Sequence, residues 1–188
     1  MWLLVRVFNN AFDSGRWAPG AVAVIGKFDG IHLGRQKIIQ RVKKLNVRCL
    51  AVTFDPLPDQ FLRLYSYRPL LSEAEKMEIL ARMGVDAAVI MSFDKELARL
   101  SPHAFAGAIL WDHLKAREIV VGEDFCFGRD RAGTAKTLEE FGRAMGFKVH
   151  AVPLVRAGGE KISASRIRGL IESGRKKEAG KPLGRELP

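Results

Sequence analysis

The sequence has little cysteine and no long run of apolar residues. Its two cysteines are Cys49, in a strand-like segment, and Cys126, in a glycine-rich one, and neither has a partner at metal-ligand spacing. This pattern argues against a disulfide framework and against a zinc site, so we expect two reduced thiols. No apolar stretch approaches the roughly 18 residues of a membrane-spanning helix. The apolar start is interrupted by Arg6 with no cleavage site behind it. We therefore expect a soluble, cytoplasmic protein with no membrane partner.

Acidic residues are also scarce relative to basic ones. The 188 residues include 31 Lys and Arg but 21 Asp and Glu, which gives a net charge of +10. A surplus of this size attracts phosphate groups, whether they belong to nucleic acid, membranes or small ligands. Nucleic acid is not expected as a partner, because the basic residues are not interleaved with aromatic ones and no known reading module is present. With 47% hydrophobic residues, the chain has the composition of one globular domain.

Short β-like runs alternate with amphipathic helix-like stretches along the chain. Strands are predicted at 21–26, 48–54, 86–91, 118–122 and 148–154, and helices at 33–45, 72–83, 101–114 and 134–145. Ser72 and Glu75 have the spacing of a capping box, and Gly84 and Gly146 stand where helices would end. Continuous apolar strands that alternate with helices indicate parallel βαβ units. The predicted fold class is α/β, a Rossmann-like doubly wound parallel sheet.

Four segments are predicted to lie at the carboxyl edge of this sheet, where such folds bind ligands. They follow the first, second, fourth and fifth predicted strands, at 26–35, 53–61, 122–133 and 162–168. Because loops at this edge lead into helix N-termini, their free N–H groups favour an anion. The shared placement of the four segments is stronger evidence for a ligand site at this edge than any one segment is.

The first of these segments, "GKFDGIHLGR", has the residues of a tight strand-to-helix turn. Gly26 and Gly30 can adopt positive φ, and Gly34 allows another group to approach the first helical turn closely. The segment is neither a Walker A loop nor a GxGxxG dinucleotide loop, because its glycine spacing differs from both. His32 and Arg35 would share one face of the helix start and could both hold phosphate oxygens.

Four motifs resemble those of one known family, and they occur in the same order over roughly residues 20 to 185. "GKFDGIHLGRQ" resembles GxFDGxHxGH, and "TFDPLP" resembles TFDPHP. "VVGEDFCFG" resembles VVGxDFxFG, and "ISASRIRGLIESG" resembles ISSTxIRxxLxxG. The chain is thereby identified as a member of the nucleotidylyltransferase superfamily, in the bacterial FAD synthetase (FMN adenylyltransferase) branch. The VVGxDFxFG segment points to flavin as the phosphate-bearing substrate.

The resemblance implies transfer of the adenylyl group of MgATP to FMN, which gives FAD and pyrophosphate. An FMN phosphate oxygen attacks the α-phosphorus in line, so the protein needs no nucleophile. Catalysis then rests on alignment and on stabilising the charge of the leaving pyrophosphate. ATP with Mg²⁺ and FMN/FAD are the expected substrates and products, and no dedicated protein metal site is expected. The expected partners are small nucleotides and flavins.

The resemblance also assigns candidate site residues in three groups. The catalytic group is His32, Arg35, Ser165 and Arg168, with Ser163, Ser165 and Arg168 expected to hold the β and γ phosphates. Further ATP-binding residues are expected at Gly26, Phe28, Gly34, Gly122, Asp124 and Ser163. The flavin pocket is expected to be lined by Phe54, Pro56, Pro58, Phe61 and Phe127. For Phe54 core packing is an equal alternative, and Asp29 is expected to stabilise the turn.

The chain departs from the family pattern at four polar positions. Arg35 replaces the second histidine of HxGH, Leu57 the histidine of TFDPHP and Ala164 a serine, and Lys27 stands where asparagine is common. Two alternatives to an active enzyme therefore stay open. The chain could be a flavin- or nucleotide-binding module that has lost catalysis, or a related transferase with another phosphate acceptor.

The expected organisation is one adenylyltransferase-like domain, residues 1–174, followed by a basic helix and tail, residues 175–188. In the family a riboflavin kinase domain usually follows the "LGR" that stands here at Leu183 to Arg185. The sequence stops three residues later, so we expect either a stand-alone adenylyltransferase, supplied with FMN by a separate riboflavin kinase, or a fragment of a longer protein. On this expectation the chain does not phosphorylate riboflavin.

Overall fold

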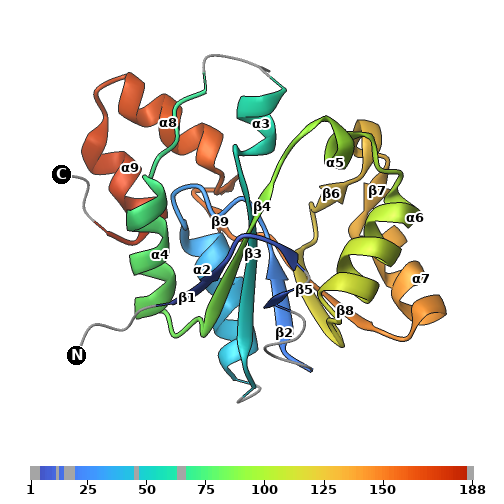
Figure 1. The fold of residues 1–188 in the computed structure, drawn as a ribbon. Helices are drawn as coiled ribbons and strands as arrows, with labels where there is room; N and C mark the ends of the chain where they lie inside the picture. The colour runs from blue at the N-terminus through green and yellow to red at the C-terminus, as the bar shows by residue number, and fades with distance from the viewer. Residues whose placement is uncertain (1–4, 12, 15–19, 45–46, 63–66, 186–188) are drawn as a thin grey trace.

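The fold is built on one parallel sheet of six strands (Figure 1). The structure, a computed structural model, describes residues 5–11, 13–14, 20–44, 47–62 and 67–185. In spatial order the strands are β1 (Arg6–Phe8), β4 (Ala87–Ser92), β3 (Cys49–Asp55), β2 (Val22–Ile25), β5 (Glu118–Gly122) and β8 (Lys148–Val152). All five neighbouring pairs are parallel. The predicted Rossmann-like α/β class is confirmed.

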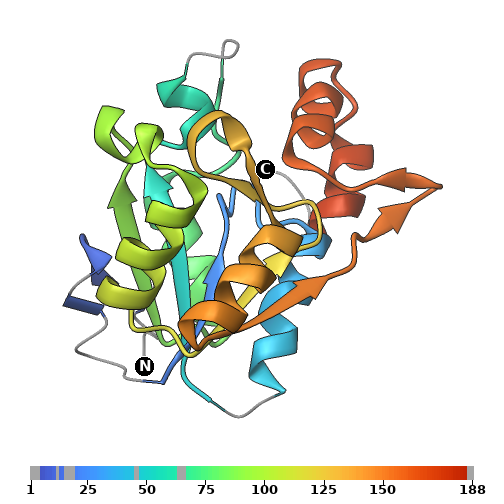
Figure 2. The same ribbon diagram turned by 90° about the vertical axis from the view of Figure 1, so that its right-hand side faces the viewer.

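Helices cover both faces of the sheet (Figures 1 and 2). One face packs against α2 (Leu33–Lys43) and α4 (Glu73–Arg82), and the other against the π-helix η1 (Phe105–His113) and α7 (Ala135–Met145). Successive side chains of a strand point to opposite faces, so Val22 and Val24 join one core while Ala23 and Ile25 join the other. Burial on both faces explains why the strands are continuously apolar.

A small additional unit follows β8 at the carboxyl edge of the sheet. It consists of the hairpin β9 (Arg156–Ala157) and β10 (Glu160–Lys161), then α8 (Ala164–Glu172) and α9 (Lys176–Leu183). Ile162, Ile167, Ala179 and Leu183 form its own small core. The remaining short elements are α3 (Pro58–Phe61), α5 (Lys95–Arg99), α6 (Pro102–Ala104), β6 (Cys126–Phe127), η2 (Arg129–Arg131) and β7 (Gly133–Thr134).

Most predicted elements are found, with small shifts at their ends. Ser72 and Glu75 form the predicted capping box at the start of α4. Gly84 and Gly146 follow α4 and α7 with φ of +76° and +93°, values at which glycine is favoured. The helix expected at 101–114 is found, but only α6 at its start is α-helical: α6 leads directly into the π-helix η1, at whose end Leu114 N–H donates to the Ile109 carbonyl. An apolar sequence pattern does not reveal this wider hydrogen-bond register.

Candidate active site

The four predicted segments do gather at one edge of the sheet, the upper edge in Figure 1. From β2 the chain continues to β3 and β4 on one side, and it later returns to β5 and β8 on the other side. The loops that leave β2 and β5 therefore diverge, and ligands of doubly wound sheets bind at this switch point. Gly26 follows β2 and Gly122 ends β5, so both predicted glycines lie beside it.

The loop from Gly26 to His32 has a strained backbone. Phe28, Gly30 and Ile31 have φ of +49°, +80° and +42°, although neither Phe28 nor Ile31 is a glycine. Positive φ in a β-branched residue such as Ile31 is rare and persists only where the surroundings enforce it. Phe28 and Ile31 are both fully buried, and their burial anchors the loop.

His32 sits at the N-cap of α2, one residue before the helix, rather than within its first turn. Its side chain is 8% exposed, and its Nδ1 has no hydrogen-bond partner among the described residues. A Cβ on Gly34 would lie 3.1 Å from the His32 ring, so the glycine makes room for the imidazole. Burial, assisted by the Arg35 and Lys161 charges, lowers the pKa of His32 to about 4 against a smaller opposing effect of Asp124. The imidazole is therefore neutral at physiological pH.

The Arg35 guanidinium lies at the switch point. Its Nη1 would be 3.4 Å from a Cβ built on Gly26 and 3.6 Å from one built on Gly122. The Arg35 side chain therefore points into the site and does not extend into solvent. Burial lowers the pKa of Arg35 while Asp124 raises it, and an arginine stays charged throughout. Within the described part of the chain this guanidinium makes no hydrogen bond, which leaves its donors available to a ligand.

Asp124 and Lys161 form an ion pair in the same site. Burial raises the pKa of Asp124, but the bond to Lys161 and the charges of Lys161 and Arg35 outweigh it and lower the pKa overall. A Cβ on Gly122 would lie 2.8 Å from Asp124 Oδ1, so this glycine is needed for the carboxylate position. Sequence reasoning missed Lys161; its place just before the "ISASRIR" segment was the available signal.

Arg168 is buried against Asp29 instead of pointing freely into the site. Its Nη1 donates to Asp29 Oδ2 over 2.5 Å, and the exposed fractions of the two residues are 8% and 4%. Asp29 also accepts from Tyr67 Oη at 2.5 Å and from Leu70 N–H at 2.8 Å, and the Arg168 guanidinium lies over the Tyr67 ring. Asp29 thus joins its loop to two distant segments, a wider structural role than stabilising its own turn.

The two predicted serines lie at the start of α8. Ser163 is the N-cap residue, and its hydroxyl accepts from Arg166 N–H at 3.3 Å. Ser165 accepts from Arg168 Nη2 at 3.3 Å, so the buried Asp29–Arg168 pair also orients this hydroxyl. The structure therefore connects Ser165 to the loop that carries His32.

The predicted flavin residues differ in exposure. Phe54 and Phe127 are 8% and 6% exposed and belong to the sheet core, so the packing alternative describes them better than a pocket wall. Phe61 is partly exposed and lies edge-on to Phe93, with ring centroids 5.5 Å apart. Phe125 is also partly exposed and stacks on Phe127. Sequence reasoning missed Phe93 and Phe125, whose rings are more accessible than those of the buried Phe54 and Phe127.

The loop after β3, which carries Pro56 and Pro58, is tied to the loop after β2. Lys27 Nζ donates to Asp59 Oδ2 over 2.6 Å, and Thr53 Oγ1 donates to the Lys27 carbonyl over 3.1 Å. Pro56 follows a cis peptide bond and is exposed, while Leu57, at the position of the family histidine, is buried. Lys27 thus forms an ion pair with Asp59. The asparagine that is common at this position has no charge and could not form it.

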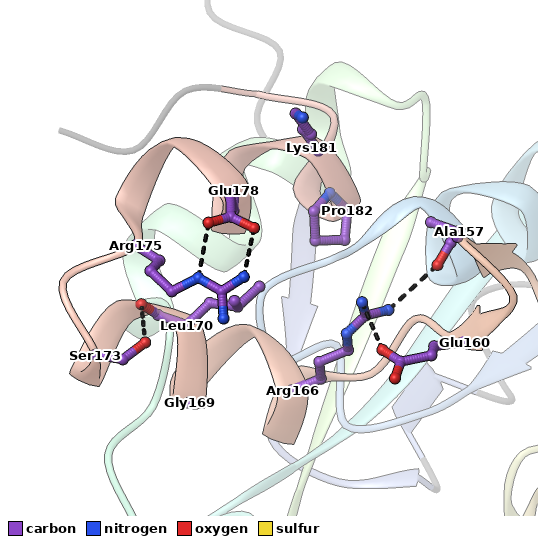
Figure 3. A pocket seen from close by; sticks show the side chains of 11 residues that line it. Ala157, Glu160, Arg166, Gly169, Leu170, Ser173, Arg175, Glu178, Lys181 and Pro182 are labelled. Carbon is purple, nitrogen blue, oxygen red and sulfur yellow. Dashed lines mark hydrogen bonds and ion pairs between the residues drawn. The ribbon is translucent and has the colours of Figure 1, made fainter.

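A pocket of about 740 Å³ lies away from this site, between the β9–β10 hairpin and helices α8 and α9 (Figure 3). Arg166 pairs there with Glu160 at 2.6 Å, and Arg175 with Glu178 at 2.6 Å. None of the predicted site residues lines it. In the described ranges no three His, Cys, Asp or Glu side chains gather as a metal site, and no helix is long and apolar enough to cross a bilayer.

The six-stranded parallel sheet, with four loops gathered at its switch point, defines an α/β fold of the nucleotidylyltransferase type. Residues 16–166 match the family described as FAD synthetase. The chain belongs to the FAD synthetase family.

Named relatives agree with this assignment. A Pseudomonas fluorescens bifunctional riboflavin kinase/FMN adenylyltransferase is 33% identical, with 97% of this chain and 59% of that protein covered. A Listeria monocytogenes FAD synthetase is 34% identical, over 87% of this chain and 68% of that protein. A Geobacillus thermodenitrificans protein, provisionally named a bifunctional riboflavin kinase/FMN adenylyltransferase, is 36% identical over 92% of this chain and 94% of its own length. The chain thus spans less than two thirds of the Pseudomonas relative.

Solved structures show the same architecture. A Streptococcus pneumoniae protein named a macrolide-efflux protein superposes with a TM-score of 0.82 at 32% identity, over 97% of this chain and 60% of that one. Pantothenate synthetase of Thermus thermophilus has a TM-score of 0.62 at 16% identity, over 96% of this chain and 81% of that one. The second likeness concerns the fold alone.

Proposed function

We propose that this chain transfers the adenylyl group of MgATP to FMN, producing FAD and pyrophosphate. The observation that carries the proposal is the convergence of His32, Arg35 and Lys161 on the switch point between β2 and β5. The positive charges of Arg35 and Lys161, the latter paired with Asp124, and a neutral imidazole suit a polyphosphate chain. Attack by an FMN phosphate oxygen at the α-phosphorus needs no protein nucleophile, so alignment and charge stabilisation supply the catalysis.

On the ATP side, the N-terminus of α2 and His32 hold phosphate oxygens. No side chain caps α2, in contrast to α7 and α8, so its first N–H groups are open to an anion. The neutral His32 ring donates one N–H, and Arg35 supplies the charge that the second family histidine would carry only in part. Ser163 and Ser165 approach the outer phosphates from α8, with Arg168 orienting Ser165.

On the flavin side, partly exposed rings support stacking of the isoalloxazine. Phe61 and Phe93 form one aromatic pair and Phe125 with Phe127 another, beyond the ends of β3, β4 and β5. Phe61, Phe93 and Phe125 are partly exposed, and Phe127 supports Phe125 from the core. Large, rigid ring faces of this kind suit a planar apolar ligand. Pro56 and Pro58 complete the proposed wall. FMN would come from a riboflavin kinase, the second activity in the names of the bifunctional relatives.

The proposed reaction is tested by incubating the protein with FMN, ATP and Mg²⁺. We expect FAD and pyrophosphate to appear in equal amounts, measured by chromatography and a coupled phosphate assay. Binding of both substrates without pyrophosphate release would identify a binding module. Faster turnover with another phosphomonoester than with FMN would identify a transferase with a different acceptor.

Arg35→Ala is expected to weaken ATP binding by about 10- to 100-fold, the effect of losing a charged hydrogen bond. FMN affinity should stay close to that of the parent. Arg35→His should restore part of the ATP affinity with a new pH dependence between about 6 and 7.5. Lys37→Ala, on the exposed side of α2, is the matched control. Parent-like ATP affinity and FAD formation in Arg35→Ala would remove Arg35 from the phosphate site.

A further inference from the structure

We propose that Arg185 is a positioning residue that holds the phosphate-facing loop in its strained shape. It acts with Gln36, Leu183 and Gly184, and we call these four residues the C-terminal clamp. The proposal rests on the function proposed above and adds a determinant of ATP binding that is remote from the loop in sequence, as Arg185 and Gly30 are 155 residues apart.

The C-terminal clamp donates hydrogen bonds to two consecutive backbone carbonyls of the loop, those of Gly30 and Ile31. Arg185 Nη2 donates to the Gly30 carbonyl over 2.7 Å. Gln36 Nε2 donates to the Ile31 carbonyl at 3.0 Å and to the Leu183 carbonyl at 2.8 Å, so it bridges the loop and the end of α9. The residue that follows these two carbonyls is His32.

Packing adds to these bonds. Gly30 has φ of +80°, and a Cβ there would lie 2.8 Å from Leu70 Cδ1 and 3.3 Å from Leu183 Cδ2. Gly184 has φ of +66°, and a Cβ there would lie 2.8 Å from Leu33 Cδ2. Both glycines therefore allow the loop, the start of α2 and the end of α9 to approach closely.

The backbone of the loop needs such support. Ile31 adopts φ of +42° beside the two clamped carbonyls and Phe28 adopts +49°, conformations that residues other than glycine rarely adopt. Strain of this kind persists only where surrounding contacts over-determine the geometry. If the hydrogen bonds of the C-terminal clamp are lost, the backbone of Ile31 can relax. His32 and the first N–H groups of α2 follow Ile31 directly in the chain and would shift with it.

Arg185 remains a charged donor in this place. Burial lowers its pKa and Glu75 raises it, but the guanidinium is protonated at any physiological pH. A charged donor bound to a carbonyl is stronger than a neutral one. The sequence motif "LGR" gives no hint of this contact, because the partner carbonyl belongs to a residue 155 positions earlier.

The test compares Arg185→Ala, Arg185→Lys and Gln36→Met with the parent. Arg185→Ala should raise the Kd for ATP about 10-fold and change FMN affinity less than about two-fold. Arg185→Lys keeps one charged donor and should recover part of the ATP affinity, and Gln36→Met should resemble Arg185→Ala. Arg175→Ala, next to α9 but paired only with Glu178 among the described residues, is the control that should match the parent.

Hydrogen exchange of the backbone amides at 30–34, measured on the protein without ligand, is the second readout. We expect faster exchange there in Arg185→Ala and unchanged exchange in the strands of the sheet. Parent-like exchange and ATP affinity would overturn the proposal, and so would equal loss of ATP and FMN affinity with faster exchange throughout. Because this readout needs no substrate, it decides on the clamp even if the parent makes no FAD.

Discussion

Arg168→Met is expected to lower the free energy of unfolding by about 3 to 5 kcal/mol, because it leaves the Asp29 carboxylate buried without its charged partner. Both groups are almost fully buried, and their bond of 2.5 Å connects the β2–α2 loop to α8. Tyr67 and Leu70 still donate to Asp29 in the variant, but neither supplies a positive charge. Urea denaturation of parent and variant measures the loss.

Arg166→Met is the matched control for this prediction. Arg166 lies on the same helix and also pairs with a carboxylate, Glu160, but both side chains are more than a third exposed. Removal of an exposed pair should cost less than about 1 kcal/mol. The double variant Asp29→Asn/Arg168→Met should recover part of the stability lost in Arg168→Met, since it removes the uncompensated charge. A loss in Arg168→Met as small as that of the control would contradict a stabilising role for the pair.

The buried pair also changes the expectation for ligand binding. The family pattern assigns Arg168 to the β and γ phosphates, which predicts weaker ATP binding and unchanged FMN binding in a variant. The structure gives its guanidinium to Asp29 and to the Ser165 hydroxyl. Weaker ATP binding is still expected, now because Ser165 loses its orientation. Ser165→Ala in the Arg168→Met background should then add little further loss, since both changes remove the same contact.

The sheet was predictable because its strands are buried on both faces. Continuous apolar runs such as 48–54 and 118–122 leave few alternatives to parallel strands between helices. Strand β1 was missed because three residues at an exposed sheet edge carry no pattern. The π-helix was missed for a different reason, since the polarity of residues 105–113 is the same for either hydrogen-bond register.

The site was predictable where one loop carries the chemistry and not where distant segments meet. His32 and Gly34 stand close together in sequence, and the space that Gly34 leaves for the imidazole is a local effect. The Asp29–Arg168 bond joins residues 139 positions apart, and Lys161 reaches Asp124 from a hairpin of two-residue strands. Such contacts depend on how α8 and the hairpin pack, which no spacing in the sequence reveals.

The free energy of unfolding is expected to fall by about 3 kcal/mol as the pH drops from 6.5 to 4, because of His32 alone. Burial, the first cause, together with Arg35 and Lys161 lowers the pKa of His32 from 6.5 to about 4 in the folded state, and Asp124 opposes them. Between these two values the unfolded histidine binds a proton that the folded one does not. Stability attributable to His32 is therefore complete above pH 6.5 and is lost as the pH falls towards 4.

His32→Asn isolates this contribution, since asparagine is polar but does not titrate. Carboxylates also titrate between pH 6.5 and 4. Their contribution to the free energy of unfolding is the same in the parent and in His32→Asn, so it cancels when the two are compared. Denaturation in urea from pH 7.5 to 4.5 should give a pH slope that is clearly steeper for the parent than for His32→Asn. In Lys161→Met the lost positive charge should raise the pKa of His32, measured by NMR titration of its ring. Equal pH slopes for parent and His32→Asn would mean that the imidazole titrates normally. At pH 6.5 the His32 ring, proposed above as a neutral donor to the ATP phosphates, would then be protonated in a fraction of the molecules.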